Sequence, residues 1–270
     1  MKSIRNYFHL WAVLFWALTL TNCAKDSGTD PDTPDPIDRS ANLLSAGSSG
    51  TDILTNENFD RIQIEIAYVE GFRPTTTAMD NLRTFLLERT FKEDITFIYR
   101  SLPSPGEQTL TLQEIATLEA ENRTLYNDGR TLAFYIYFAD APSDGDDPVE
   151  GLVTLGAVYR NTSMVIHEST LRTLASRSVV ITLSDVETTT MTHEFGHLFG
   201  LVDLGTPEVN PHEDNSFPNH CNVEDCLMRA ELEFGSGYRA IMEKRSAKGL
   251  ESLPSLDAEC LRDLQAIGGR

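Results

Sequence analysis

The segment His193-Glu194-Phe195-Gly196-His197 has the clearest capacity for chemistry in this sequence. Helical positions four apart lie on one face, so His193 and His197 can direct their imidazoles at a single metal ion. Neutral imidazole is a preferred ligand of Zn2+. Glu194 adjoins the first histidine and can take a proton from a metal-activated water and pass it to a leaving amine. The spacing therefore predicts a zinc site with Glu194 as general base, which is chemistry that hydrolyses peptide bonds.

A helix has to carry this segment, and the flanking residues supply its expected ends. Ser184 and Glu187 have the spacing of a capping box, so we expect the helix to begin at about Asp185. Gly200 is well placed to end it. The alternative is a surface helix that carries these residues by chance, but such a match is uncommon in a chain with six histidines.

Apolar periodicity predicts the elements that precede the motif helix. The order is strand, helix, strand, helix, strand, strand, strand and then the motif helix. The expected segments are residues 60–68, 77–91, 95–99, 111–123, 132–138, 152–159 and 164–167. This order indicates an α/β (α+β) domain, a mixed sheet with a long helix packed beneath it.

The motif and two later segments resemble the metzincin zinc peptidases. The matching residues are His193-Glu194-x-x-His197-x-x-Gly200-x-x-Asp203, then His220-Cys221-x4-Cys226-Leu227-Met228, which is similar to archaemetzincins, and a C-terminal stretch over residues 256–269. The resemblance covers roughly residues 60–270. It implies a mostly parallel, twisted sheet with an active-site helix, a Met-turn at Met228 beneath the zinc, and a C-terminal helix.

The resemblance leaves the third zinc ligand open. In metzincins a turn at the glycine returns the chain to deliver this ligand, which is His in most members and Asp in the snapalysin group. Asp203 has the right spacing, whereas His220 has the right neighbours and imidazole is the commoner ligand. His212 lies in the segment between Asp203 and His220 and is the third alternative. If His220 is the ligand, we expect Asp203 to act as a helix-terminus or outer-sphere acceptor.

The cysteines allow more than one arrangement. Cys221 and Cys226 enclose four residues, so a local disulfide with Cys260 left as a buried thiol is one expectation, and pairing of Cys260 with either of them is another. Archaemetzincins build a second zinc site with a later CxxC motif. That motif is absent here, so a second zinc is not expected.

The N-terminus has the features of a bacterial export signal. Lys2 and Arg5 precede an apolar run over residues 10–20, which is too short to span a bilayer comfortably. The next residues, Leu20-Thr21-Asn22-Cys23, resemble a lipobox, which implies lipidation of Cys23. We therefore expect an exported protein, lipid-anchored to the outer membrane or cell surface, with secretion or a periplasmic location as the alternative.

Composition and charge complete the prediction. We expect a signal peptide over residues 1–23, a flexible acidic linker over 24–55 and a zinc metallopeptidase domain over 56–270. A net charge of −19 argues against nucleic acid as a partner. The expected partners are a protein or peptide substrate and, through lipidated Cys23 only, a membrane; the chain is expected to be monomeric.

Two functions from different classes fit these features. The first is a zinc-dependent endopeptidase. The alternative is a surface-anchored binding lipoprotein with a vestigial or structural zinc site. The complete His-Glu-His set favours the enzyme, because a binding module has no need of Glu194.

Overall fold

The computed structural model describes residues 38–270, except 148, 150, 234 and 250–252. The expected signal peptide, the lipidation site at Cys23 and the first part of the linker lie outside the described residues. No helix within the described part is both long and apolar enough to cross a membrane.

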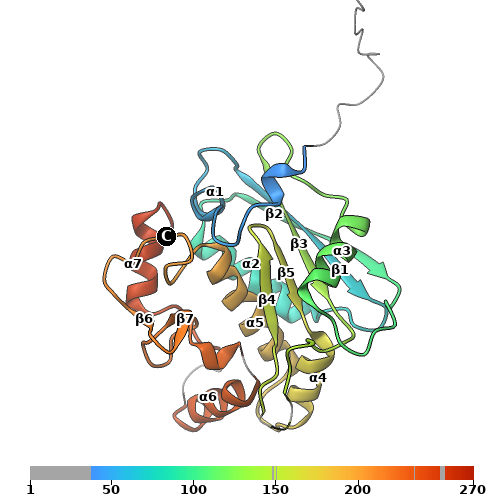
Figure 1. The fold of residues 1–270 in the computed structure, drawn as a ribbon. Coiled ribbons are helices and arrows are strands. Elements are labelled where there is room, and N and C mark those ends of the chain that lie inside the picture. The colour runs from blue at the N-terminus through green and yellow to red at the C-terminus, as the bar shows by residue number, and fades with distance from the viewer. Residues whose placement is uncertain (1–37, 148, 150, 234, 250–252) are drawn as a thin grey trace, which may run out of the picture. The chain divides into compact units, whose positions relative to one another are not determined.

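A five-stranded sheet with the order β2-β1-β3-β5-β4 lies at the centre of this part (Figure 1). Four strands run parallel, and β4 pairs with β5 in the antiparallel sense at one edge. The strands are β1 (Arg61–Val69), β2 (Asp94–Leu102), β3 (Thr131–Phe138), β4 (Gly156–Arg160) and β5 (Ser163–Ile166). The predicted α/β (α+β) class with a mixed, mostly parallel sheet is confirmed.

Helices and a small hairpin complete the fold. The helices are η1 (Ser40–Asn42), α1 (Gly50–Leu54), α2 (Thr76–Arg89), α3 (Leu112–Asn122), α4 (Glu168–Ser176), α5 (Leu183–Leu198), η2 (Ala230–Leu232), α6 (Gly235–Ala247) and α7 (Ala258–Ala266). The hairpin consists of β6 (Glu213–Asp214) and β7 (Phe217–Cys221). In Figure 1 the hairpin, α6 and α7, coloured orange to red, lie at the left and lower left of the view.

Alternating side chains along the inner strands bury both faces of the sheet. Ile64 of β1 and Phe134 of β3 belong to the core cluster that includes the apolar residues of α2 and α5. Ala67 of β1 and Tyr135 of β3 point to the other face and share a smaller cluster with α3. The motif helix α5 is therefore held against the sheet by packing along most of its length.

The motif helix begins earlier than predicted. Thr182 caps α5, and its hydroxyl accepts a hydrogen bond from the Asp185 backbone N–H while the Asp185 carboxylate accepts one from the Thr182 N–H. The predicted capping box of Ser184 and Glu187 is wrong. Glu187 instead accepts hydrogen bonds from Thr75, the cap of α2, and so joins two helices. The Glu187 carboxylate therefore binds a residue of another helix and does not cap its own helix.

Packing also begins earlier along the chain than the predicted boundary at residue 56. Asn42 is buried, and its Nδ2 atom donates to the Ala133 carbonyl at 3.0 Å and to Asn127 Oδ1 at 2.8 Å. Helix α1 then buries Ile53 and Leu54. The described end of the segment expected to be a linker is thus fixed to the sheet through side-chain amides, which apolar periodicity does not reveal.

We expect Glu168→Gln to stabilise the protein at neutral and alkaline pH. Burial, followed by repulsion from the buried Glu187 carboxylate, raises the pKa of Glu168 to about 8. The folded state therefore retains a proton that the unfolded chain releases near its ordinary pKa, so the free energy of unfolding falls as pH rises from about 4.5 towards 8. The variant should not show this decrease, so its free energy of unfolding at pH 8 should exceed that of the wild type by on the order of 3 kcal/mol.

Denaturant unfolding of the wild type and the variant at pH 5 and pH 8 measures this difference. Glu121→Gln, at an exposed position of α3, is the matched control and should leave the pH profile unchanged. Parallel profiles for the wild type and Glu168→Gln would contradict the assignment.

Candidate metal centre

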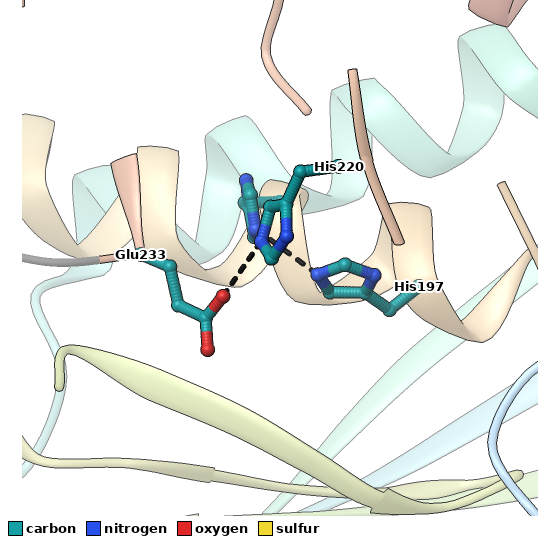
Figure 2. Close-up of side chains that lie close together, drawn as sticks. His197, His220 and Glu233 are labelled. Carbon is teal, nitrogen blue, oxygen red and sulfur yellow. Dashed lines mark hydrogen bonds and ion pairs between the residues drawn. The ribbon is translucent and has the colours of Figure 1, made fainter. Parts of the chain in front are cut away.

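Three histidines and one carboxylate meet at the C-terminal half of α5 (Figure 2). His193 and His197 come from α5, His220 from β7 and Glu233 from the end of η2. Their donor atoms all lie within 4.8 Å of one another. The Nε2 atoms of His193 and His197 are 3.1 Å apart, and His220 Nε2 is 2.6 Å from Glu233 Oε2. Zinc–nitrogen bonds of 2.0–2.1 Å in a tetrahedron place donors about 3.3 Å apart, so the set has the dimensions of a zinc site.

The hydrogen bonds of the rings direct unprotonated nitrogens into this space. His193 Nδ1 lies 2.7 Å from the Leu227 carbonyl, and His220 Nδ1 lies 3.0 Å from the Pro218 carbonyl. A carbonyl only accepts hydrogen bonds, so both Nδ1 atoms carry protons and, in the neutral rings, the Nε2 atoms do not. Such convergence of lone pairs is favourable only around a cation, and the residues present therefore fit zinc.

Burial fixes the charge state of the two helix histidines. Burial and then the neighbouring His220 lower the pKa of His193 to about 4, and burial followed by the other two histidines lowers that of His197 well below its ordinary value. For His220, burial opposes protonation, but the hydrogen bond and charge of Glu233 outweigh it and raise the pKa. The two α5 rings are thus ready to donate lone pairs, while Nε2 of His220 lies 2.6 Å from the Glu233 carboxylate.

Glu194 lies beside the histidines and is almost completely buried. The Val158 N–H of the edge strand β4 donates to its carboxylate, and Oε1 has no hydrogen-bond partner among the described residues. Burial and then the Glu233 carboxylate raise its pKa well above the ordinary value. Gly156 makes the close approach possible, because a Cβ atom there would lie 3.0 Å from Glu194 Oε1.

Met228 lies directly against the motif helix, at the place expected for a Met-turn residue. A Cβ atom on Gly196 would be 2.1 Å from the Met228 sulfur, so the glycine lets the turn pack against α5. The turn also supplies the Leu227 carbonyl that orients His193, and the Met228 carbonyl accepts a hydrogen bond from the Cys221 N–H at 2.7 Å. Met228 therefore acts through packing and backbone contacts and is not itself one of the converging donors.

Gly200 ends the motif region with a left-handed turn, as its type predicts. Its φ is +82°, and a Cβ atom there would lie 2.9 Å from Thr206. Asp203, three residues later, is exposed, has a φ of 62° and lies outside the group of converging donors that the described residues form. The chain then makes the β6–β7 hairpin, which brings His220 back to the two α5 histidines.

A second group of possible metal ligands includes the last residue of the hairpin. Cys221, Cys226, Cys260 and Asp257 have their donor atoms within 4.8 Å of one another. All three cysteines are buried free thiols, so the local disulfide considered for Cys221 and Cys226 is not formed. The sulfur atoms of Cys226 and Cys260 are 3.7 Å apart, and Cys221 Sγ is 3.1 Å from Asp257 Oδ2.

This group fits a second zinc ion, contrary to the expectation drawn from the missing CxxC motif. Zinc–sulfur bonds of 2.3 Å in a tetrahedron place sulfurs about 3.8 Å apart, close to the observed separation. Asp257 stands three residues before Cys260, where the motif would have its first cysteine. Hydrogen bonds from the other two thiols lower the pKa of Cys221 to about 4, which favours a thiolate ligand. His212, the third candidate for the first site, lies at this group instead, with Nε2 3.5 Å from Cys260 Sγ.

We expect the protein to hold about two zinc ions per chain and Cys226→Ser to hold about one. The variant should also unfold at a lower temperature, because metal bound only by the folded state contributes to its stability. Metal analysis after dialysis and thermal unfolding with and without added zinc measure both effects. Equal zinc content in the wild type and the variant would exclude the thiol group as a metal site.

Glu233 is the residue of the first group that no sequence pattern indicated. Glu233 belongs to no recognised motif, and its spacing from Met228 does not predict that its side chain lies near the histidines. The turn through η2 places it there: the Glu233 N–H donates to the Ala230 carbonyl, and its own carbonyl accepts from the Leu155 N–H.

No family model matches the sequence, and no curated protein matches it either. Among solved structures, the chain is similar in fold to metallopeptidases. One is an archaemetzincin from Methanopyrus kandleri, with a TM-score of 0.48 and 13% identity over 77% of this chain and 96% of that protein. Another is metalloproteinase-II from Bacteroides fragilis, with a TM-score of 0.42 and 11% identity over 79% of this chain and 55% of that protein.

Proposed function

We propose that this chain is a zinc-dependent endopeptidase in which His193, His197 and His220 hold the metal and Glu194 is the general base. The observation that carries the proposal is the convergence of three imidazole Nε2 atoms beside a buried, partly unpaired carboxylate. Zinc bound there would polarise the scissile carbonyl and lower the pKa of a bound water.

Glu194 would perform the proton transfers of the reaction. One part of its carboxylate is held by the Val158 N–H, while Oε1 is left without a partner among the described residues. Oε1 is thus free to accept a proton from the attacking water and to return it to the leaving amine. The fixed backbone contact keeps the carboxylate in one orientation, which reduces the entropy cost of the transfer.

The edge strand β4 offers a way to align the substrate. It is the last strand of the sheet, it runs antiparallel to its neighbour, and its Val158 N–H contacts the general base. An extended peptide could add to this edge through backbone hydrogen bonds and place its scissile bond beside Glu194. Recognition through the backbone suits an endopeptidase because every peptide substrate presents the same groups.

The purified full chain provides the test. The zinc content is measured first, and cleavage of casein and of a peptide library is then followed with and without a chelator. Internal cleavage that the chelator abolishes and added zinc restores is expected. Zinc binding without cleavage of any substrate would favour the second function, a binding lipoprotein with a vestigial or structural metal site.

A further inference from the structure

We propose that Glu233 is a fourth protein ligand of the metal, which closes the site in the substrate-free enzyme and leaves it when substrate binds. This inference rests on the proposed function, since it concerns the same zinc. It adds a residue that the metal-binding motif does not contain and a resting state in which water has no open position.

The contact between His220 and Glu233 requires a positive charge between the two atoms. His220 Nε2 and Glu233 Oε2 are 2.6 Å apart, while His220 Nδ1 donates its proton to the Pro218 carbonyl. When zinc occupies Nε2, no proton remains between the two atoms, so the carboxylate can stay in place only by binding the same ion.

Within the described part of the chain, the Glu233 side chain has no ion-pair partner other than His220. This side chain is only 19% exposed. The ligand atoms of Glu233 and the three histidines lie within 4.8 Å of one another, an arrangement that a divalent cation stabilises.

The backbone of Glu233 connects this carboxylate to the proposed substrate path. Its carbonyl accepts a hydrogen bond of 3.0 Å from the Leu155 N–H, immediately before β4. A peptide that pairs with β4 would therefore bind beside the segment that positions Glu233. The substrate carbonyl and the carboxylate would compete for the same coordination position, so Glu233 would have to withdraw before turnover.

Glu233→Gln tests the proposal, with Glu231→Gln as the matched control. Glu231 lies two residues earlier, pairs with Arg229 and is not among the converging donors. Zinc affinity is measured on the full chain by competition with a chelator, and NMR of the cadmium-loaded protein reports the nitrogen–oxygen site separately from the sulfur-rich one. Glu233→Gln should weaken zinc binding at the histidine site by about tenfold or more. It should shift the nitrogen–oxygen resonance alone, and the control should change neither quantity.

A small zinc-binding probe, acetohydroxamate, tests the closure. It should bind Glu233→Gln about tenfold more tightly than the zinc-loaded wild type, because it no longer has to displace a carboxylate. Unchanged zinc affinity with an unchanged cadmium resonance would overturn the fourth-ligand assignment, and equal hydroxamate affinity would overturn the closure. A wild-type chain with no metal at the histidine site would instead refute the proposed function, and this inference with it.

Discussion

Glu194→Gln should lose peptide hydrolysis while keeping zinc. The amide has nearly the shape of the carboxylate, but it cannot accept a proton from water, and no described residue forms a hydrogen bond with the buried Oε1. Loss of general-base catalysis typically costs between 10² and 10⁴ in rate, so the turnover number on a cleaved peptide should fall by at least about 100-fold. Zinc affinity, measured by chelator competition, should stay within the range of the wild type because the three imidazoles are unchanged.

Glu187→Gln provides the control on the same helix. Glu187 also has a buried carboxylate, but this carboxylate contacts Thr75 at the start of α2 and lies outside the donor group. This variant should retain turnover. Undiminished hydrolysis by Glu194→Gln would contradict the proposed mechanism even if the zinc site itself were established.

His220→Ala and Asp203→Asn should separate the two main candidates for the third ligand. His220→Ala removes a converging Nε2 atom, so zinc affinity at this site should fall by more than about 100-fold, since loss of a residue that merely orients a ligand already costs 10–100-fold. Asp203→Asn should leave zinc affinity and turnover unchanged. Asparagine is chosen because it tolerates the left-handed backbone at this position, so the charge is removed without adding strain.

Calorimetric zinc titration of the two variants and the wild type measures the difference. His212→Ala completes the set, and because His212 lies at the thiol group it should affect the second metal and not the first. A large loss of affinity in Asp203→Asn with an unaffected His220→Ala would reverse the ligand assignment.

The parts of the site that the sequence predicted are those whose geometry is local. His193, Glu194 and His197 lie within one turn of one helix, and the helical repeat alone brings them together. The third histidine could not be decided in the same way. Asp203 has the local spacing, but the hairpin that returns His220 depends on packing and on contacts such as the Cys221 N–H to the Met228 carbonyl. Periodicity contains no information about such long-range contacts.

Capping signals illustrate the same limit within a single element. Thr111 and Glu114, at the start of the segment predicted over residues 111–123, form a capping box, because Glu114 is exposed and its carboxylate forms no hydrogen bond with any other described residue. Ser184 and Glu187 have the same spacing, yet Glu187 is buried against α2 and the cap falls to Thr182. A local motif predicts correctly where tertiary contacts do not claim its side chains.

The adjacency of His220 and Cys221 on β7 has a consequence for how this protein could change during evolution. Successive strand residues face opposite ways, so one peptide bond joins a residue of the first donor group to a residue of the second. The thiol group thus sets where His220 stands, independently of how many residues follow Gly200. Lengthening a loop costs little, about 0.6 kcal/mol for each doubling, so the segment between Gly200 and His220 is free to grow, shrink or acquire new contacts while His220 keeps its position.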